Sequence, residues 1–263
     1  MTPQSIEPYV PARTIDEVIA QLNAVIDRAR REKSRLGYFA VLYRNVTIKV
    51  KEGIAAGHFE DGERMERLDV IFANRYLDAY ECFRRGGQTT KCWNASFRSA
   101  ARWRPLVLQH LLLGINAHIN LDLGVAAALT SPGDQLPSLK HDFDEINKIL
   151  HSMIDDVEDK LGMVWMALRL LDRLGWRVDE TLVSFSIDTA RVAAWDVAQR
   201  LAPLGPDEMQ TEIDRLDRHV ELLAALISNP GFYLSVLNLW IRLRERGDVP
   251  HIIDVLSRES KQA

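Results

Sequence analysis

The chain has 263 residues, 47% hydrophobic and 27% charged, which is enough apolar material for one large globular domain. A formal net charge of −4 and a pI of about 6.0 lack the basic excess typical of nucleic-acid-binding proteins, so we expect no nucleic acid partner. The two cysteines, Cys82 and Cys92, exclude a disulfide framework and a cysteine-rich zinc site.

The N-terminal segment, residues 1–13, contains three prolines and is predicted to form an extended arm. It lacks the basic and apolar regions of a signal peptide, so we expect a cytoplasmic protein. Thr14 followed by Glu17 fits a capping box, and the apolar residues after it repeat at helical spacing. The first helix is therefore predicted to begin at Thr14.

Residues 38–56 fit two structures. The run VTIKV is β-branched and alternates, which would suit a strand, but no partner strand follows anywhere in the chain. We therefore predict a helix here.

The next helix is predicted over residues 61–85, with a broad apolar and aromatic face. Asp69 shares that face with aromatic residues. Such a carboxylate either pairs with an arginine, for example Arg75 or Arg102, or serves as a ligand, and pairing is the more common outcome.

The most apolar stretch, residues 104–129, is predicted to be a helix buried on nearly every side. It is long enough to span a bilayer, but its polar side chains would make insertion costly, and we expect no membrane span. Gly114, His118 and Asp122 recur every four residues and so share one stripe of a regular helix. Polar groups in such a helix must find partners or bind something.

A loop at residues 131–137 precedes a helix over 138–159, and so short a connection favours antiparallel packing of that helix on the central one. Asp122 would then lie near His141 and Asp144. Further helices are predicted from Gly162, over 179–204, over 206–228, up to Arg246, and around 252–256.

The fold is thus predicted to be all-α: a single helical bundle of about eight helices around the buried central helix, spanning residues 14–258. Residues 179–258 could form a C-terminal subdomain, and residues 259–263 form a polar tail.

The central stripe suggests a metal site. His118 and Asp122 lie one helical turn apart, where an imidazole nitrogen and a carboxylate oxygen could share a divalent metal such as zinc. Further ligands must come from other helices, and the candidates are His141, Asp144 and Asp69.

The alternative is a polar network without a metal, in which His118 and Asp122 bond to each other or to packed neighbours. The other polar side chains expected near this site are His110, Asn116, Asn120, Asp142, Asn147 and His151.

The motif INAHINLDL, residues 115–123, resembles the signature of a bacterial helical family of unknown function. The segments LDVIFANRYLDAY, HDFDEIN and ARVAAWDVA look similar as well, so the resemblance covers most of the chain. It implies an all-α fold and no assigned activity. Its signature maps here onto Asn116, His118, Asn120 and Asp122, with Asp142 and Asn147 in addition.

A second resemblance, to helical zinc-dependent phospholipases C and nucleases, rests on the pattern L-G-x-x-x-H-x-x-x-D. Leu113, Gly114, His118 and Asp122 match it. The proline and histidine that follow in that group, and its N-terminal tryptophan ligand, are missing here. The resemblance therefore implies at most a reduced metal site at His118 and Asp122.

Three hypotheses follow. The first is a metal-dependent hydrolase or metal-binding protein. The second is a non-catalytic protein that binds an unknown small molecule or acts as a scaffold, with the His/Asn/Asp cluster as a structural network. The third is an assembly subunit, for instance a homo-oligomer, that uses its apolar C-terminal helices as an interface. The substrate cannot be read from these residues.

Overall fold

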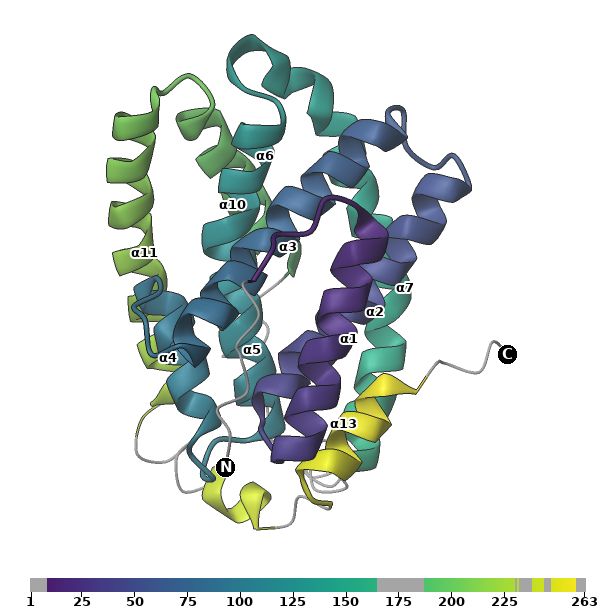
Figure 1. Ribbon diagram of the computed structural model, residues 1–263, viewed down its shortest axis with the longest axis vertical. Helices are drawn as coiled ribbons and strands as arrows, with labels where there is room; N and C mark the ends of the chain where they lie inside the picture. Colours follow the sequence, from purple (N-terminus) through teal and green to yellow (C-terminus); the bar gives the residue numbers. More distant parts are fainter. Residues whose placement is uncertain (1–8, 165–186, 230, 232–237, 244–246, 259–263) are drawn as a thin grey trace.

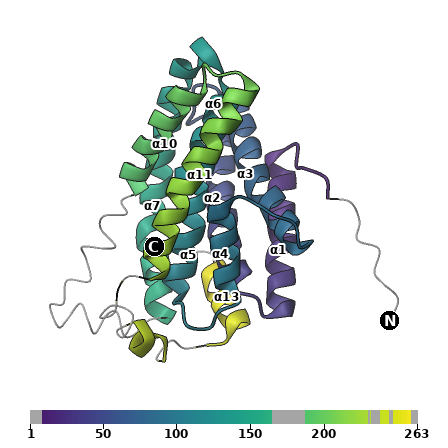
Figure 2. The same cartoon turned by 90° about the vertical axis from the view of Figure 1, so that its left-hand side faces the viewer.

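The computed structural model describes residues 9–164, 187–229, 231, 238–243 and 247–258, and all regular structure in these ranges is helical. The all-α prediction is confirmed. The helices stand roughly side by side along the long axis of the molecule (Figures 1 and 2).

The N-terminal half supplies four helices: α1 (Ile15–Glu32), α2 (Leu36–Ala55), α3 (Gly62–Arg84) and α4 (Lys91–Ala100). Half of the predicted capping box is present at α1. Thr14 Oγ1 accepts the backbone N–H of Glu17 at 3.2 Å, but the Glu17 side chain accepts the N–H of Arg13 instead of that of Thr14. The ambiguous run VTIKV lies inside α2, so the helical prediction for it is confirmed.

The central helix is continuous from Val107 to Thr130 but not regular. It consists of α5 (Val107–Ala117), a π-helical turn η1 (His118–Leu123) and α6 (Gly124–Thr130). This helix is long and apolar enough to cross a membrane. Within its most apolar 18-residue stretch, 78% is buried inside the protein. It is therefore the core helix of the bundle.

After the central helix, the 3-10 helix η2 (Gly133–Leu139) turns the chain, and α7 (Lys140–Val164) runs back in the opposite direction (Figure 1). Gly162 lies within α7 and does not begin a new helix as predicted, because glycine is tolerated inside a helix. The remainder of that predicted helix lies outside the described residues.

The C-terminal part contributes α10 (Ile187–Leu201), α11 (Pro206–Ser228) and α13 (Val249–Ser257). α10 packs on α6 and η1, α11 packs on α4 and α5, and α13 packs on α1, α2 and α7. The helix predicted to end at Arg246 lies largely outside the described residues.

Glycines in the central helix allow two neighbouring helices to approach it closely. A Cβ at Gly124 would lie 2.7 Å from the backbone oxygen of Ala194 in α10, and one at Gly114 would lie 2.4 Å from the ring of Phe39 in α2. Gly114 therefore makes room for a side chain of this protein's own core.

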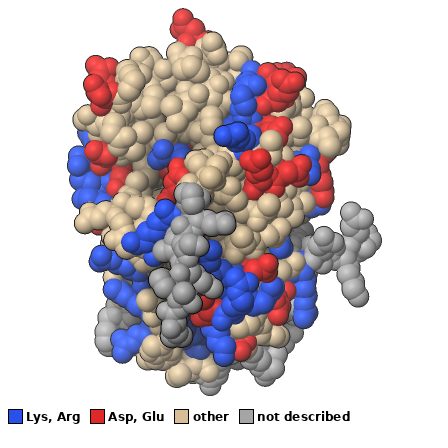
Figure 3. Space-filling view, in the orientation of Figure 1, with Lys and Arg blue, Asp and Glu red and all other residues tan. Residues whose placement is uncertain are grey.

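Most charged side chains of the described residues lie at the surface. On the face drawn in Figure 3, acidic and basic side chains are interspersed, with the basic ones more numerous toward the lower half. The few charged groups buried among the described residues, including Asp69, Asp122, Asp142 and Arg191, therefore require a specific explanation.

Candidate functional site

The central helix contains a π-helical turn at the predicted site. His118 begins this turn and Asp122 lies near its end, and both side chains have Trp93 as a neighbour. A π turn closes its hydrogen bonds over one more residue than an α turn, and such turns are frequent at functional sites. The two side chains nevertheless differ in their hydrogen bonding.

Asp122 is buried, and each of its two carboxylate oxygens accepts a hydrogen bond from another helix. One carboxylate oxygen accepts a hydrogen bond from Arg75 Nε at 2.6 Å, and the other accepts one from the indole nitrogen of Trp93 at 2.7 Å. Burial raises the pKa of Asp122, and both partners oppose that rise. The structure does not bring His141 or Asp144 to Asp122: both are exposed and bond to other residues, while Arg75 and Trp93 bind the two oxygens of Asp122.

His118 lies in an aromatic enclosure. Its ring stacks on Phe72 with centroids 3.5 Å apart, and the rings of Tyr43 and Phe39 meet it edge-on at 4.2 and 5.5 Å. Both imidazole nitrogens are buried and lack a hydrogen-bond partner within the described part of the chain. Burial, with Arg75 nearby, holds the pKa of His118 well below its usual value, so the imidazole is neutral.

Asp69, on α3, is a second buried polar group without a partner. Its Oδ2 atom has no hydrogen bond to any described residue, so the expected pairing with Arg75 or Arg102 is absent there. Arg75 pairs instead with Asp122. Burial raises the pKa of Asp69 to about 7, with Glu66 adding to the effect.

Tyr43, on α2, completes this polar group. Its hydroxyl is buried and unpartnered among the described residues, and burial, with Asp69 nearby, raises its pKa well above the usual value. Tyr43 and His118 are therefore neutral at pH 7, and Asp69, which lies close to them, is about half protonated.

These three side chains line one cavity of about 250 Å³. The cavity lies between α2, α3, the central helix and α7, and α10 contributes Arg191. The rest of its wall is aliphatic and aromatic. The central helix and α7 face each other across this space, which explains why their expected direct packing is largely replaced by contacts of α7 with α2 and α13.

Among the described residues, Arg191 is the one cationic side chain that lines the cavity. It is 5% exposed, its guanidinium lies over the ring of Phe143 at 4.4 Å, and it donates from Nε to Asn147 Oδ1 and from Nη2 to the backbone oxygen of Phe143. Burial lowers the pKa of Arg191 to about 10, opposed by Asp144 and Asp188, so it remains charged at neutral pH. Our sequence reasoning missed this residue, although an arginine within the apolar run ARVAAW was a usable signal.

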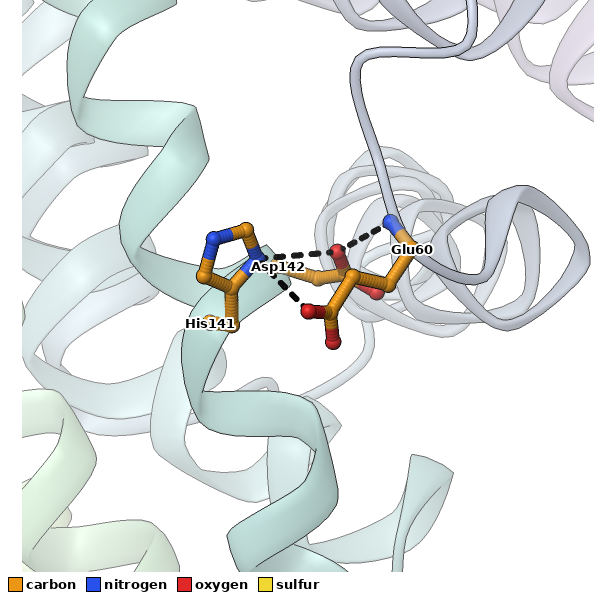
Figure 4. A group of neighbouring side chains, drawn as sticks. All are labelled: Glu60, His141 and Asp142. Carbon is orange, nitrogen blue, oxygen red and sulfur yellow. Dashed lines mark hydrogen bonds and ion pairs between the residues drawn. The ribbon is translucent and has the colours of Figure 1, made fainter.

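A second group of ionisable side chains, of which two are exposed and one is buried, lies at the surface. His141 Nδ1 is 3.6 Å from Glu60 Oε1 and 3.7 Å from Asp142 Oδ1 (Figure 4). Within the described residues, Glu60, His141 and Asp142 are the one set of three or more His, Cys, Asp or Glu whose ligand atoms lie close enough to share a metal ion. None of the three lines the cavity.

The carboxylate of Asp142 already accepts three hydrogen bonds from within the protein. It is fully buried and accepts the backbone N–H groups of Glu60 at 2.7 Å and Asp61 at 3.1 Å, together with Arg64 Nη2 at 2.8 Å. Burial opposes ionisation, but these hydrogen bonds hold the pKa of Asp142 below its usual value. Asp142 thus fastens α7 to the start of α3.

The other described side chains predicted to belong to the site do not line the cavity. Asn116 donates to the backbone oxygen of Val220 and accepts from Asn120, which ties the central helix to α11. Asp144 pairs with Lys140 at the surface. His110 is buried in a different place, edge-on to Tyr38, and burial lowers its pKa to about 3.

The side chain of His151 lies outside the described part. Of the five proposed metal ligands, His118 and Asp69 reach the cavity, Asp122 is bound to Arg75 and Trp93, and His141 and Asp144 lie at the surface. The structure does not bring the five together.

Comparison with known proteins gives one match. Residues 15–230 match the model of a family of unknown function, DUF5995. No curated protein and no solved structure matches the chain.

Proposed function

The chain belongs to this family of unknown function, and we propose, from its cavity, that it binds a small and largely apolar molecule. The polar part of that molecule would bond to Tyr43, Asp69 and His118, and its apolar part would fill the remainder. The observation that carries this proposal is the group of unpartnered buried polar atoms on the wall of a single cavity.

A buried polar atom without a partner costs about 1–3 kcal/mol, and Tyr43, Asp69 and His118 leave several such atoms in one place. A ligand that supplies the missing hydrogen bonds would recover this free energy on binding. Ligand pockets in general are apolar with a few well-placed polar groups, and this cavity has that character.

Water is the competing occupant. Water could satisfy the polar atoms near His118, but most of the wall is apolar, and a buried water needs two to four polar partners. A molecule with an apolar body fits the whole wall better than water does.

The test is binding of an environment-sensitive apolar fluorescent probe, together with native mass spectrometry of protein purified without detergent. Val46 lies on the cavity wall, so Val46→Phe should fill the space and weaken probe binding at least about tenfold. Val192, on α10, is 64% exposed and does not line the cavity, so Val192→Phe is the matched control. If the parent binds no probe, or both variants bind equally, the proposal is wrong.

A second candidate is a divalent metal ion, such as zinc, at Glu60, His141 and Asp142, supported by the proximity of their ligand atoms. Arg64 and two backbone N–H groups already compensate Asp142, so we rank this site second. A metal-dependent hydrolase would place its substrate at this surface, away from the cavity.

Calorimetric titration with zinc would test the metal candidate. His141→Ala should abolish binding, whereas His219→Ala, at an exposed histidine of α11, should leave it unchanged. Equal binding by both variants would exclude this site.

A further inference from the structure

The cavity that we propose as the binding site contains a cation that the polar group around His118 does not use. Arg191 enters its wall from α10, while Tyr43, Asp69 and His118 enter from α2, α3 and the central helix. The described part of the wall thus carries four polar side chains: the neutral Tyr43 and His118, the carboxyl of Asp69, which is protonated below about pH 7, and the guanidinium of Arg191.

Arg191 is held in place by neutral atoms. Its Nε and Nη2 atoms donate to Asn147 Oδ1 and to the backbone oxygen of Phe143, and its plane is fixed over the ring of Phe143. Both acceptors belong to α7, so the guanidinium cannot swing out without breaking this contact between α10 and α7.

Opposite charge close to Arg191 is limited. Within the described part of the chain no carboxylate forms an ion pair with its guanidinium, although Asp144 and Asp188 lie near enough to favour the charged form. Asp144 is at the surface and pairs with Lys140. A buried charge is costly unless an opposite charge or enough hydrogen bonds compensate it.

A carboxylate is the anion that fits here. Arginine presents planar N–H groups that match carboxylate oxygens, and such charge-assisted hydrogen bonds are about twice as strong as neutral ones. The volume of about 250 Å³ lies just below the usual range of about 300–1,000 Å³ for ligand pockets, which favours a small molecule over a long lipid or a large cofactor.

We infer that the ligand is a small carboxylic acid with an apolar body, whose carboxylate pairs with Arg191 and whose body lies along the apolar wall toward His118. A hydroxyl or carbonyl farther along the body would meet Tyr43, Asp69 and His118. This inference rests on the proposed function, because it names the chemical class of the molecule that the same cavity holds.

The experiment compares ligands that share an apolar body and differ in their polar end. Octanoic acid, octanol and octylamine are titrated against the bound fluorescent probe at pH 6, where the acid is ionised and Asp69 is mostly protonated. We expect the parent protein to bind octanoic acid at least about tenfold more tightly than octanol, and to bind octylamine most weakly. A hydroxy derivative of octanoic acid should bind more tightly than octanoic acid itself.

Variants of Arg191 assign the preference to this side chain. Arg191→Gln should reduce the preference for acid over alcohol to less than about threefold. Arg191→Lys should keep part of the preference, because it keeps the charge and loses the planar geometry. Thermal melting shows that each variant is folded, and the ligand comparison in the parent protein needs no variant.

The outcomes separate the two proposals. If octanol binds the parent as tightly as octanoic acid, the carboxylate inference is wrong and the binding function stands. If the acid preference survives Arg191→Gln, the inference is also wrong. If none of the ligands displaces the probe and the probe itself does not bind, the proposed function fails.

Discussion

The imidazole ring of His118 lies flat against the phenyl ring of Phe72, with 3.5 Å between the ring centroids and 11° between the planes. The stack holds a neutral imidazole at the cavity wall by its faces, and leaves both nitrogens at the ring edge without a partner among the described residues. His118 thus contributes to packing through its ring and is available for binding through its nitrogens.

His118→Phe should keep the stack and remove the unpartnered nitrogens. We expect the free energy of unfolding to stay the same or to rise by about 1 kcal/mol, because buried unsatisfied polar atoms cost about 1–3 kcal/mol. Urea denaturation measures this change, and probe titration should show weaker binding of polar ligands. A loss of more than about 2 kcal/mol would mean that the imidazole has a stabilising partner in the folded protein.

Asp122→Ala should behave in the opposite way. It would strand the guanidinium of Arg75 and the indole N–H of Trp93, so we expect unfolding to become easier by about 3 kcal/mol. The control is Asp254→Ala, which removes an exposed ion pair with Arg30 and should cost less than about 1 kcal/mol. Equal losses in the two variants would contradict the role of Asp122 as a buried anchor.

Gly114→Ala tests the close approach of α2 to the central helix. The added Cβ would lie 2.4 Å from the ring of Phe39, which also lines the cavity, so we expect a loss of about 1–3 kcal/mol and weaker probe binding. Gly205→Ala is the control, because a Cβ there meets nothing within 4 Å. Chemical denaturation of both variants should separate them, and similar stabilities would show that Phe39 moves aside freely.

Asp69 should make stability depend on pH. Its pKa is raised from 3.8 to about 7 in the folded protein, so the folded state holds this proton more tightly than the unfolded state does. Its contribution to stability is therefore fully present below about pH 4, falls as the pH rises to about 7, and is lost above that value. The total is at most about 4 kcal/mol, the equivalent of that pKa change.

The measurement for Asp69 compares denaturation midpoints of the parent and of Asp69→Asn between pH 4 and 8. The stability of Asp69→Asn relative to the parent should increase with pH across this range, because asparagine has no proton to lose. Asp196→Asn, at an exposed carboxyl on α10, should show no such trend. A constant difference between parent and Asp69→Asn would rule out the raised pKa.

The positions and type of the helices could be predicted from the sequence to a large degree. The capping residue Thr14 and the apolar period of α3 and α11 are local properties of the chain. The helix at the β-like run in α2 was predicted instead from the lack of a partner strand in the rest of the sequence. Local periodicity is set by the backbone geometry of a helix, so it can be read without knowing the packing. Burial of the central helix followed from its apolar composition in the same way.

The site depended on contacts between distant segments. The sequence pattern put His118 and Asp122 one turn apart on the central helix, but Arg75, 47 residues away in the chain, binds Asp122, while aromatic rings from other helices enclose His118. Arg191 reaches Asn147 across 44 residues, and the cavity exists because four helices meet around a space that their side chains leave unfilled. The sequence by itself determined which segments are helical and which faces are buried, because these depend on neighbours three or four residues away. Only the tertiary structure decided which buried polar groups are paired and which face a cavity, because that depends on how whole helices pack.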